Sequence, residues 1–138
     1  MLSIKTVSHL NSGCETSNTL YQEGGVIYLY TFGHNRAHSF IDNIKLAQAK
    51  SEKWFEDTEK DTIALFFEKS LSAPFSDGVS NKTQSFVGDF LDSLKKDFTG
   101  MYAFISSHDA DDDICNILTL TFIKGNDFHS LELFWSID

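Results

Sequence analysis

Three segments near the end of the chain alternate apolar and polar residues, with short turns between them. They cover Met101 to Ser106, Ile114 to Lys124 and Phe128 to Ile137, and turn-forming residues lie at His108 to Asp113 and at Gly125 to Asp127. Alternation with a period of two is typical of strands that bury one face, and short turns join antiparallel neighbours. The C-terminal third is therefore predicted to form a three-stranded antiparallel meander.

A stripe of apolar residues at helical spacing precedes this meander. Its members are Phe86, Val87, Phe90, Leu91, Leu94 and Phe98. Charged residues occupy the opposite side, Asn81 and Gln84 resemble a capping pair, and Thr99-Gly100 is a stop signal. This pattern predicts an amphipathic helix that starts near Asn81 and ends near Phe98.

Two earlier stretches also have helical spacing. Phe40, Ile41, Ile44, Ala47 and Phe55 predict a helix from about Arg36 to Glu56. A further helix is expected to begin near Thr58, although residues 62–67 also fit a buried strand, so helix and strand both stay open for 62–72.

Two short apolar runs near the start complete the expected elements. Leu2, Ile4 and Val7 suggest a first strand, and Val26 to Phe32, bounded by glycines, reads as a second. Together the patterns predict an α+β fold: an antiparallel sheet with the C-terminal three-stranded meander and two to three helices packed on one face. A length of 138 residues favours a single domain, residues 1–138.

Charge and cysteine usage narrow the functional classes. The net charge is −9, and most of the excess lies in the second half of the chain, so binding to nucleic acid or to anionic lipid is disfavoured. The first residues do not have the pattern of a secretory signal, and no segment is long and apolar enough to span a membrane. Cys14 and Cys115, the only cysteines, suggest neither a disulfide framework nor a zinc site, and the expected location is the cytoplasm.

Catalytic patterns are missing from the sequence. There is no nucleophile elbow, no family-type Cys motif and no phosphate-binding glycine loop, so we expect neither enzymatic activity nor a cofactor. His34 and His38, four residues apart, would share a face if a helix began early enough, as in two-histidine zinc sites. A small-ligand or metal-binding module, or an unrecognised enzyme, that uses this region is the alternative hypothesis.

Two groups of carboxylates are the strongest functional signal. Asp109, Asp111, Asp112 and Asp113 fall within one predicted turn, and Glu56, Asp57, Glu59 and Asp61 lie where two predicted helices meet. Like charges this close repel one another unless solvent, a metal or a basic partner offsets the repulsion. A calcium loop of the EF-hand type starting at Asp109 fails, because Ile114 would replace its glycine and Leu120 its closing glutamate. We therefore predict both groups as contacts for a basic partner, while helix-start electrostatics also accounts for Glu59 and Asp61.

In general character the chain resembles the cytoplasmic immunity proteins of bacterial toxin systems, including contact-dependent growth inhibition. The resemblance is carried by small size, acidic composition and the acid groups at 56–61 and 109–113, and no motif adds to it. It implies binding to one cognate basic toxin domain, expected to be a nuclease, whose active site the acidic surface would occlude.

Overall fold

The computed structural model describes residues 2–20, 25–34, 52–72, 78–111, 115–125 and 127–136, with the backbone alone at 18–20, 25–34 and 111. These residues form three helices and four strands. In chain order they are α1 (Ile4–Leu20), β1 (Gly25–His34), α3 (Asp57–Leu71), α4 (Asn81–Asp97), β2 (Tyr102–Asp111), β3 (Cys115–Lys124) and β4 (Asp127–Ser136).

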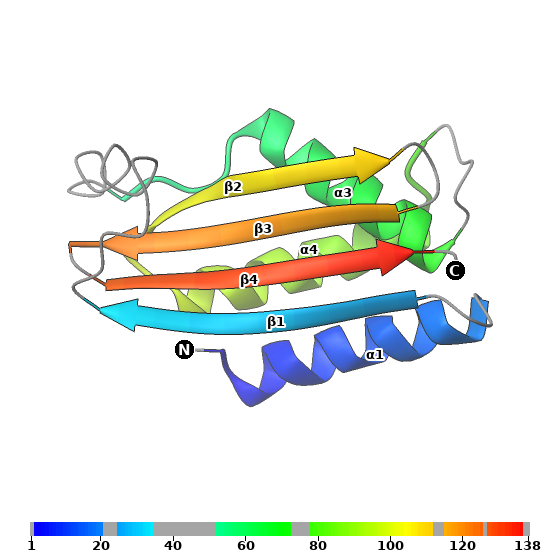
Figure 1. Ribbon diagram of the computed structural model, residues 1–138, viewed down its shortest axis with the longest axis horizontal. Coiled ribbons are helices and arrows are strands. Elements are labelled where there is room, and N and C mark those ends of the chain that lie inside the picture. The colour runs from blue at the N-terminus through cyan, green and yellow to red at the C-terminus, as the bar shows by residue number, and fades with distance from the viewer. Residues whose placement is uncertain are drawn as a thin grey trace.

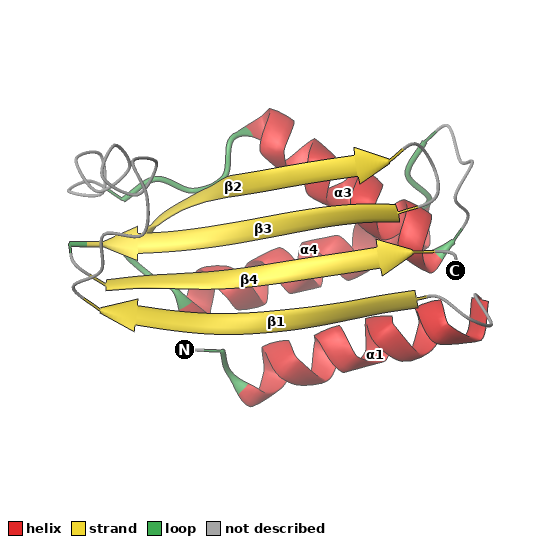
Figure 2. Cartoon of the chain, viewed as in Figure 1, coloured by secondary structure: helices red, strands yellow, loops and turns green. Residues whose placement is uncertain are grey.

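The four strands make one antiparallel sheet in the order β1-β4-β3-β2 (Figure 1). The predicted meander is confirmed as β2-β3-β4, and the predicted strand at Val26 to Phe32 is confirmed as β1, which pairs with β4. The sheet lies in front of α3 and α4, and α1 runs beside β1 (Figure 2). This arrangement confirms the α+β class with helices on one face of an antiparallel sheet.

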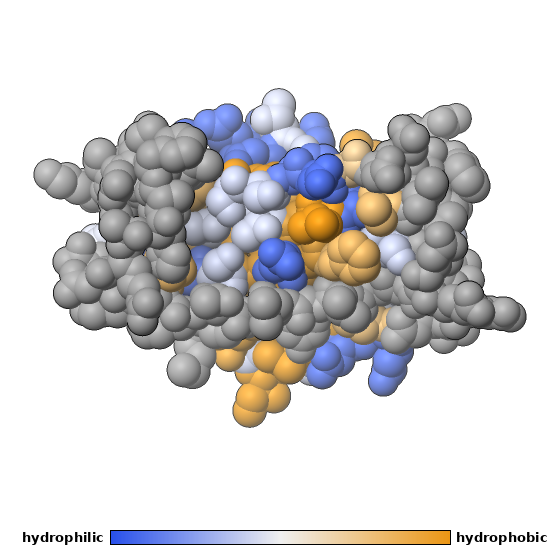
Figure 3. Space-filling view, viewed as in Figure 1, coloured by the Kyte–Doolittle hydropathy of each residue, from blue (hydrophilic) through white to orange (hydrophobic). Residues whose placement is uncertain are grey.

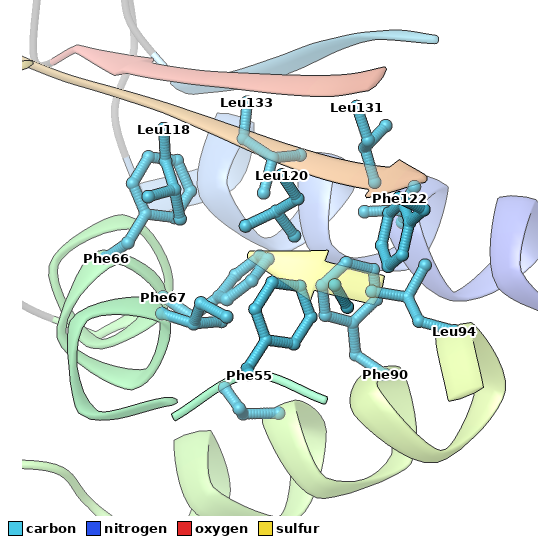
Figure 4. Close-up of a cluster of buried hydrophobic side chains, with 14 of the residues drawn as sticks. Phe55, Phe66, Phe67, Phe90, Leu94, Leu118, Leu120, Phe122, Leu131 and Leu133 are labelled. Atoms are coloured by element: carbon cyan, nitrogen blue, oxygen red, sulfur yellow. The ribbon is translucent and has the colours of Figure 1, made fainter. Parts of the chain in front are cut away.

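A single apolar cluster fills the space between the sheet and the helices (Figure 4). β3 contributes Leu118, Leu120 and Phe122, all fully buried. β4 contributes Leu131, Leu133 and Trp135. The same cluster holds Phe66 and Phe67 from α3, Phe90 and Leu94 from α4, and Leu10 from α1. Because alternate residues of β3 and β4 enter this core, the residues between them must point to the opposite face of the sheet.

The central region forms two helices, of which α4 was predicted and α3 was one of two alternatives. The stripe on α4 buries Val87, Phe90 and Leu94, with Phe98 just after its end. Its N-cap is Ser80 rather than Asn81: the Ser80 hydroxyl accepts a hydrogen bond of 3.3 Å from the Thr83 N–H. Residues 57–71 are helical, which settles the choice left open for this stretch in favour of a helix.

The predicted first strand is wrong, because Ile4 to Leu20 form α1. The buried side of α1 consists of Thr6, Leu10, Gly13 and Ser17, which recur at helical spacing but are mostly small or polar. Ile4, which suggested a strand, is 90% exposed. The apolar residues Leu2, Ile4 and Val7 therefore did not mark the buried side, and the helix packs against β1, α4 and α3 mainly through small residues and Leu10.

The contact between α1 and α4 explains the small residues of α1. A Cβ added at Gly13 would lie 2.8 Å from Cζ of Phe86, so any larger residue would require this ring to move. At the other end of the contact, the Asp97 carboxylate accepts hydrogen bonds from the Ser3 N–H (3.0 Å) and the Thr6 hydroxyl (2.6 Å). A carboxylate at a helix N-terminus stabilises the exposed N–H groups there.

The helix predicted from Arg36 to Glu56 lies largely outside the described residues. Its last part, residues 52–56, is described and is not helical. Instead Lys53 forms a parallel bridge beside Tyr102, with a 2.6 Å hydrogen bond from the Ala103 N–H to the Lys53 carbonyl. The end of the predicted helix is thus corrected to an extended connection along β2.

Candidate partner-binding surface

Strand β2 is an edge of the sheet, and it carries one of the predicted acid groups. The predicted turn at 108–113 is wrong for its first part, because His108 to Asp111 continue β2 and pair with Cys115 to Leu118 of β3. Asp109 is exposed on this strand, and Asp111 is its last residue. Asp112 and Asp113 lie outside the described residues. The acid group therefore belongs in part to a strand edge and not to a free loop.

The second acid group divides into two kinds of residue. Glu56 pairs with Lys53 at 2.7 Å, and this hydrogen bond raises the pKa of the Lys53 ammonium. The Glu59 carboxylate accepts the Ile105 N–H at 2.7 Å and the Glu56 N–H at 3.0 Å. Asp57, 4.0 Å from the Lys60 ammonium, and Asp61 are exposed. Glu56 and Glu59 thus have partners within the chain, whereas Asp57 and Asp61 face solvent.

Glu59 connects the start of α3 to β2, and this gives a test of its role. Replacing Glu59 with Ala should lower the free energy of unfolding by about 1 to 2 kcal/mol, because two backbone donors lose a charged acceptor. Asp61→Ala removes a carboxylate from the same helix without such contacts and should change stability by less than about 0.5 kcal/mol. Urea unfolding checks both, and hydrogen exchange at the Ile105 amide should accelerate only in the Glu59 variant. Equal stability of the two variants would contradict the connection.

Both acid groups lie along the same edge of the sheet. Glu59 contacts Ile105, and Asp109 follows four residues later on β2. At about 3.4 Å per residue this places the two groups roughly 13 Å apart. They border one edge without forming a single cluster.

The face of the sheet away from the helices is divided into a buried half and an open half. Near the start of β2 it holds a second cluster, Tyr102, Phe104, Ile123 and Phe128, whose members are all buried. Toward the other end of β2, the row Asp109, Ile117 and Phe134 crosses three strands, and the next row is Ser107, Thr119 and Glu132. Ile117, Phe134 and Thr119 are half-buried, and Asp109, Ser107 and Glu132 are exposed.

We call these six residues the open sheet surface. Figure 3 looks onto this face and shows hydrophobic residues in its middle with hydrophilic residues on both sides. Asp109 and Glu132 sit on β2 and β4, two strand spacings across the sheet and one row along it, which places them roughly 12 Å apart. An apolar centre with charged residues at its rim is the usual anatomy of a protein interface.

Sequence reasoning found Asp109 but missed its neighbours on this surface. Ile117, Glu132 and Phe134 were assigned only to strands, because their common face depends on the register between three strands. The strand alternation contained a usable signal: Ile117 and Phe134 are apolar residues on the face opposite the buried leucines. Two apolar residues there, outside the second buried cluster, indicate a partly exposed apolar area.

The buried carboxylate Glu68 has a structural role. Burial would raise the pKa of Glu68, but the backbone hydrogen bond from Ser80 and the hydroxyls of Ser80, Thr83 and Ser72 outweigh this and hold the pKa below its usual value. The Ser80 N–H donates to the carboxylate at 2.6 Å. Glu68 thereby joins the end of α3 to the start of α4, and its oxygen is held between the two helices.

Metal and thiol chemistry find little support among the described residues. His34 is the last residue of β1, so the helical pairing with His38 is wrong at its first member, and His38 lies outside the described residues. In the part of the chain that the structure describes, no three His, Cys, Asp or Glu residues are grouped so that they could hold a metal ion. Cys14 and Cys115 are free thiols, and burial raises the pKa of Cys14, which lowers its reactivity.

Comparisons with known proteins do not assign this chain to a family. No family model, curated protein or solved structure matches this chain. No helix in the described ranges has the length and apolar character needed to cross a bilayer.

Proposed function

We propose that this chain binds a basic protein in the cytoplasm and blocks its active surface, as an immunity protein neutralises a cognate toxin. The toxin would be a nuclease domain, whose substrate channel must attract negative charge. In this proposal the chain itself has no catalytic activity. The observation that carries it is the open sheet surface, where exposed Asp109 and Glu132 flank half-buried Ile117 and Phe134.

The charges and the apolar centre have different tasks in this proposal. The net charge of −9 and the rim carboxylates would attract a basic domain and speed its association. Ile117 and Phe134 would lose their remaining solvent contact in the complex and so slow dissociation. Asp57 and Asp61 are exposed on the side of α3 turned away from Glu59, and in this proposal they add to the overall negative charge and not to the contact itself. Glu56 and Glu59 would not contact the partner directly in this proposal. Their carboxylates bind groups of the same chain and so stabilise the fold.

The test is a binding measurement with the purified product of the adjacent upstream gene. The double variant Asp109→Lys, Glu132→Lys should associate at least tenfold more slowly, because it replaces attraction with repulsion at the contact. The control is Asp89→Lys, Asp92→Lys, which makes the same change in net charge at exposed positions of α4. The control should slow association much less, and added salt should reduce the difference between them.

Two results would contradict the proposal. One is the lack of any complex together with the lack of protection of cells that carry the toxin. The other is an equal loss in both double variants, which would show that net charge acts without a defined surface.

A further inference from the structure

Within the described ranges, hydrogen-bond acceptors cover the outer side of strand β2 along its first half only. There the Ala103 N–H donates to the Lys53 carbonyl at 2.6 Å, and the Ile105 N–H donates to the Glu59 carboxylate at 2.7 Å. These two acceptors satisfy donors that point away from the sheet. Beyond Ile105 the situation changes, because residues 107–110 are all exposed.

A bulge separates the two halves. The register of β2 with β3 shifts between Ile105 and Ser107, so Ser106 is the extra residue, and its hydroxyl accepts a 2.8 Å hydrogen bond from Thr121. Along an antiparallel edge, alternate residues direct their backbone groups outward, and one inserted residue changes which ones do so. Outward amides before the bulge belong to Ala103 and Ile105, so those after it belong to His108 and Ala110.

We propose that the basic partner adds an extended segment to this second half of β2, antiparallel or parallel, and so enlarges the sheet. The inference rests on the proposed function and specifies its binding mode. A strand added to an exposed sheet edge gains main-chain hydrogen bonds, and its side chains choose the partner. Asp109, exposed on this half of β2, would select lysine or arginine on the same face of the added strand.

The same carboxylate argues against a second copy of this chain at the edge. Two β2 strands that pair through this half would bring Asp109 of one copy near Asp109 of the other. Like charges on paired strands are destabilising, and charged residues on edge strands commonly prevent such self-association. The edge therefore accepts a basic strand and disfavours its own copy.

Binding of two synthetic peptides to the full chain tests this inference. The first peptide has nine residues alternating Lys and Val, which can place every lysine on the face that carries Asp109. The second has the same sequence with alternate amides N-methylated, so its charge is kept and its hydrogen bonding is lost. We expect the first peptide to bind at least tenfold more tightly and to slow hydrogen exchange at the His108 and Ala110 amides.

Two substitutions in the chain provide the matched comparison. Ala110→Pro removes one outward N–H, and proline is tolerated at edge strands, whereas Ala110→Ser keeps the N–H. The proline variant should lose at least tenfold in peptide affinity and the serine variant should not; thermal unfolding of both verifies that the fold is intact. If Ala110→Pro unfolds the chain, the comparison between the unmodified and the N-methylated peptide still tests strand addition.

Several outcomes would overturn the inference. They are equal binding of both peptides, no binding of either, unchanged exchange at His108 and Ala110, or dimers of the chain formed through this edge. If the upstream gene product binds Ala110→Pro as tightly as the unmodified chain, strand addition is wrong while the proposed function stands. If that product binds neither form and the peptides behave as expected, the proposed function fails and the edge remains a strand-binding site.

Discussion

Replacing Phe67 with Ala should lower the free energy of unfolding by about 4 kcal/mol. Phe67 is fully buried and joins α3 to α4 (Figure 4). Its ring centroid lies 5.2 Å from that of Phe66, 5.1 Å from Phe86 and 5.3 Å from Phe90. Truncation removes three aromatic contacts and leaves a cavity that the packed helices cannot fill.

The matched control is Leu65→Ala, two residues away on the same helix. Leu65 is 44% exposed, so its loss should cost less than about 1 kcal/mol. Chemical denaturation compares the variants, and Phe67→Leu, which keeps most of the volume, should fall between them if the Ala variant does not fold. Equal losses at 65 and 67 would show that α3 does not pack as described.

Acid should destabilise the protein through His129 between pH 6.5 and pH 4. His129 lies on the helix side of β4 with its ring centroid 4.9 Å from that of Phe98, and burial lowers its pKa from 6.5 to about 4. In this window the unfolded chain binds a proton and the folded chain does not, so stability is complete above pH 6.5 and is lost as the pH falls toward 4. The shift would be worth about 3 kcal/mol if the ring were fully shielded, and we expect roughly 2 kcal/mol because 9% of the residue is exposed.

The variant His129→Leu removes this titrating group and replaces it with an apolar side chain of similar size. The difference in stability between pH 7 and pH 4 should therefore be smaller in the variant than in the unmodified chain by roughly 2 kcal/mol. Thermal or urea unfolding at both pH values measures it. An identical pH dependence in both proteins would contradict a buried neutral histidine. The lowered pKa of Glu68 acts in a separate window, since its contribution is lost only as the pH falls through that lowered pKa.

The parts of the fold that the sequence predicted correctly are those with strong local periodicity. The stripe ending at Phe98 formed α4, and the alternating segments formed β3 and β4 close to their expected limits, while β2 runs five residues beyond its predicted end at Ser106. In each, one face carries enough apolar area to require burial in one orientation. The helix α1 was not predicted, because Thr6, Gly13 and Ser17 occupy its buried side. Small and polar residues give almost no hydrophobic periodicity.

The candidate site was predictable only where one segment carried the signal. Asp109 was identified because four carboxylates stand close together in the sequence. The predicted group at 56–61 does not act as one acidic surface, because the Glu59 carboxylate accepts a hydrogen bond from the Ile105 amide. These two residues are 46 positions apart, so no local sequence pattern could predict the contact. Whether a carboxylate faces solvent or a backbone donor depends on such distant neighbours.

Periodicity and composition by themselves determined the α+β class, the helix α4, the meander and the excess of negative charge, because each is a property of residues close in sequence. The structure decided that residues 57–71 are helical, a stretch for which the sequence left helix and strand open. Only the tertiary structure decided that β1 pairs with β4, that β2 is an edge with a bulge, and that Asp109, Ile117, Phe134 and Glu132 share one surface. Strand order and register fix these neighbours, and both are set by the packing of distant segments against one core.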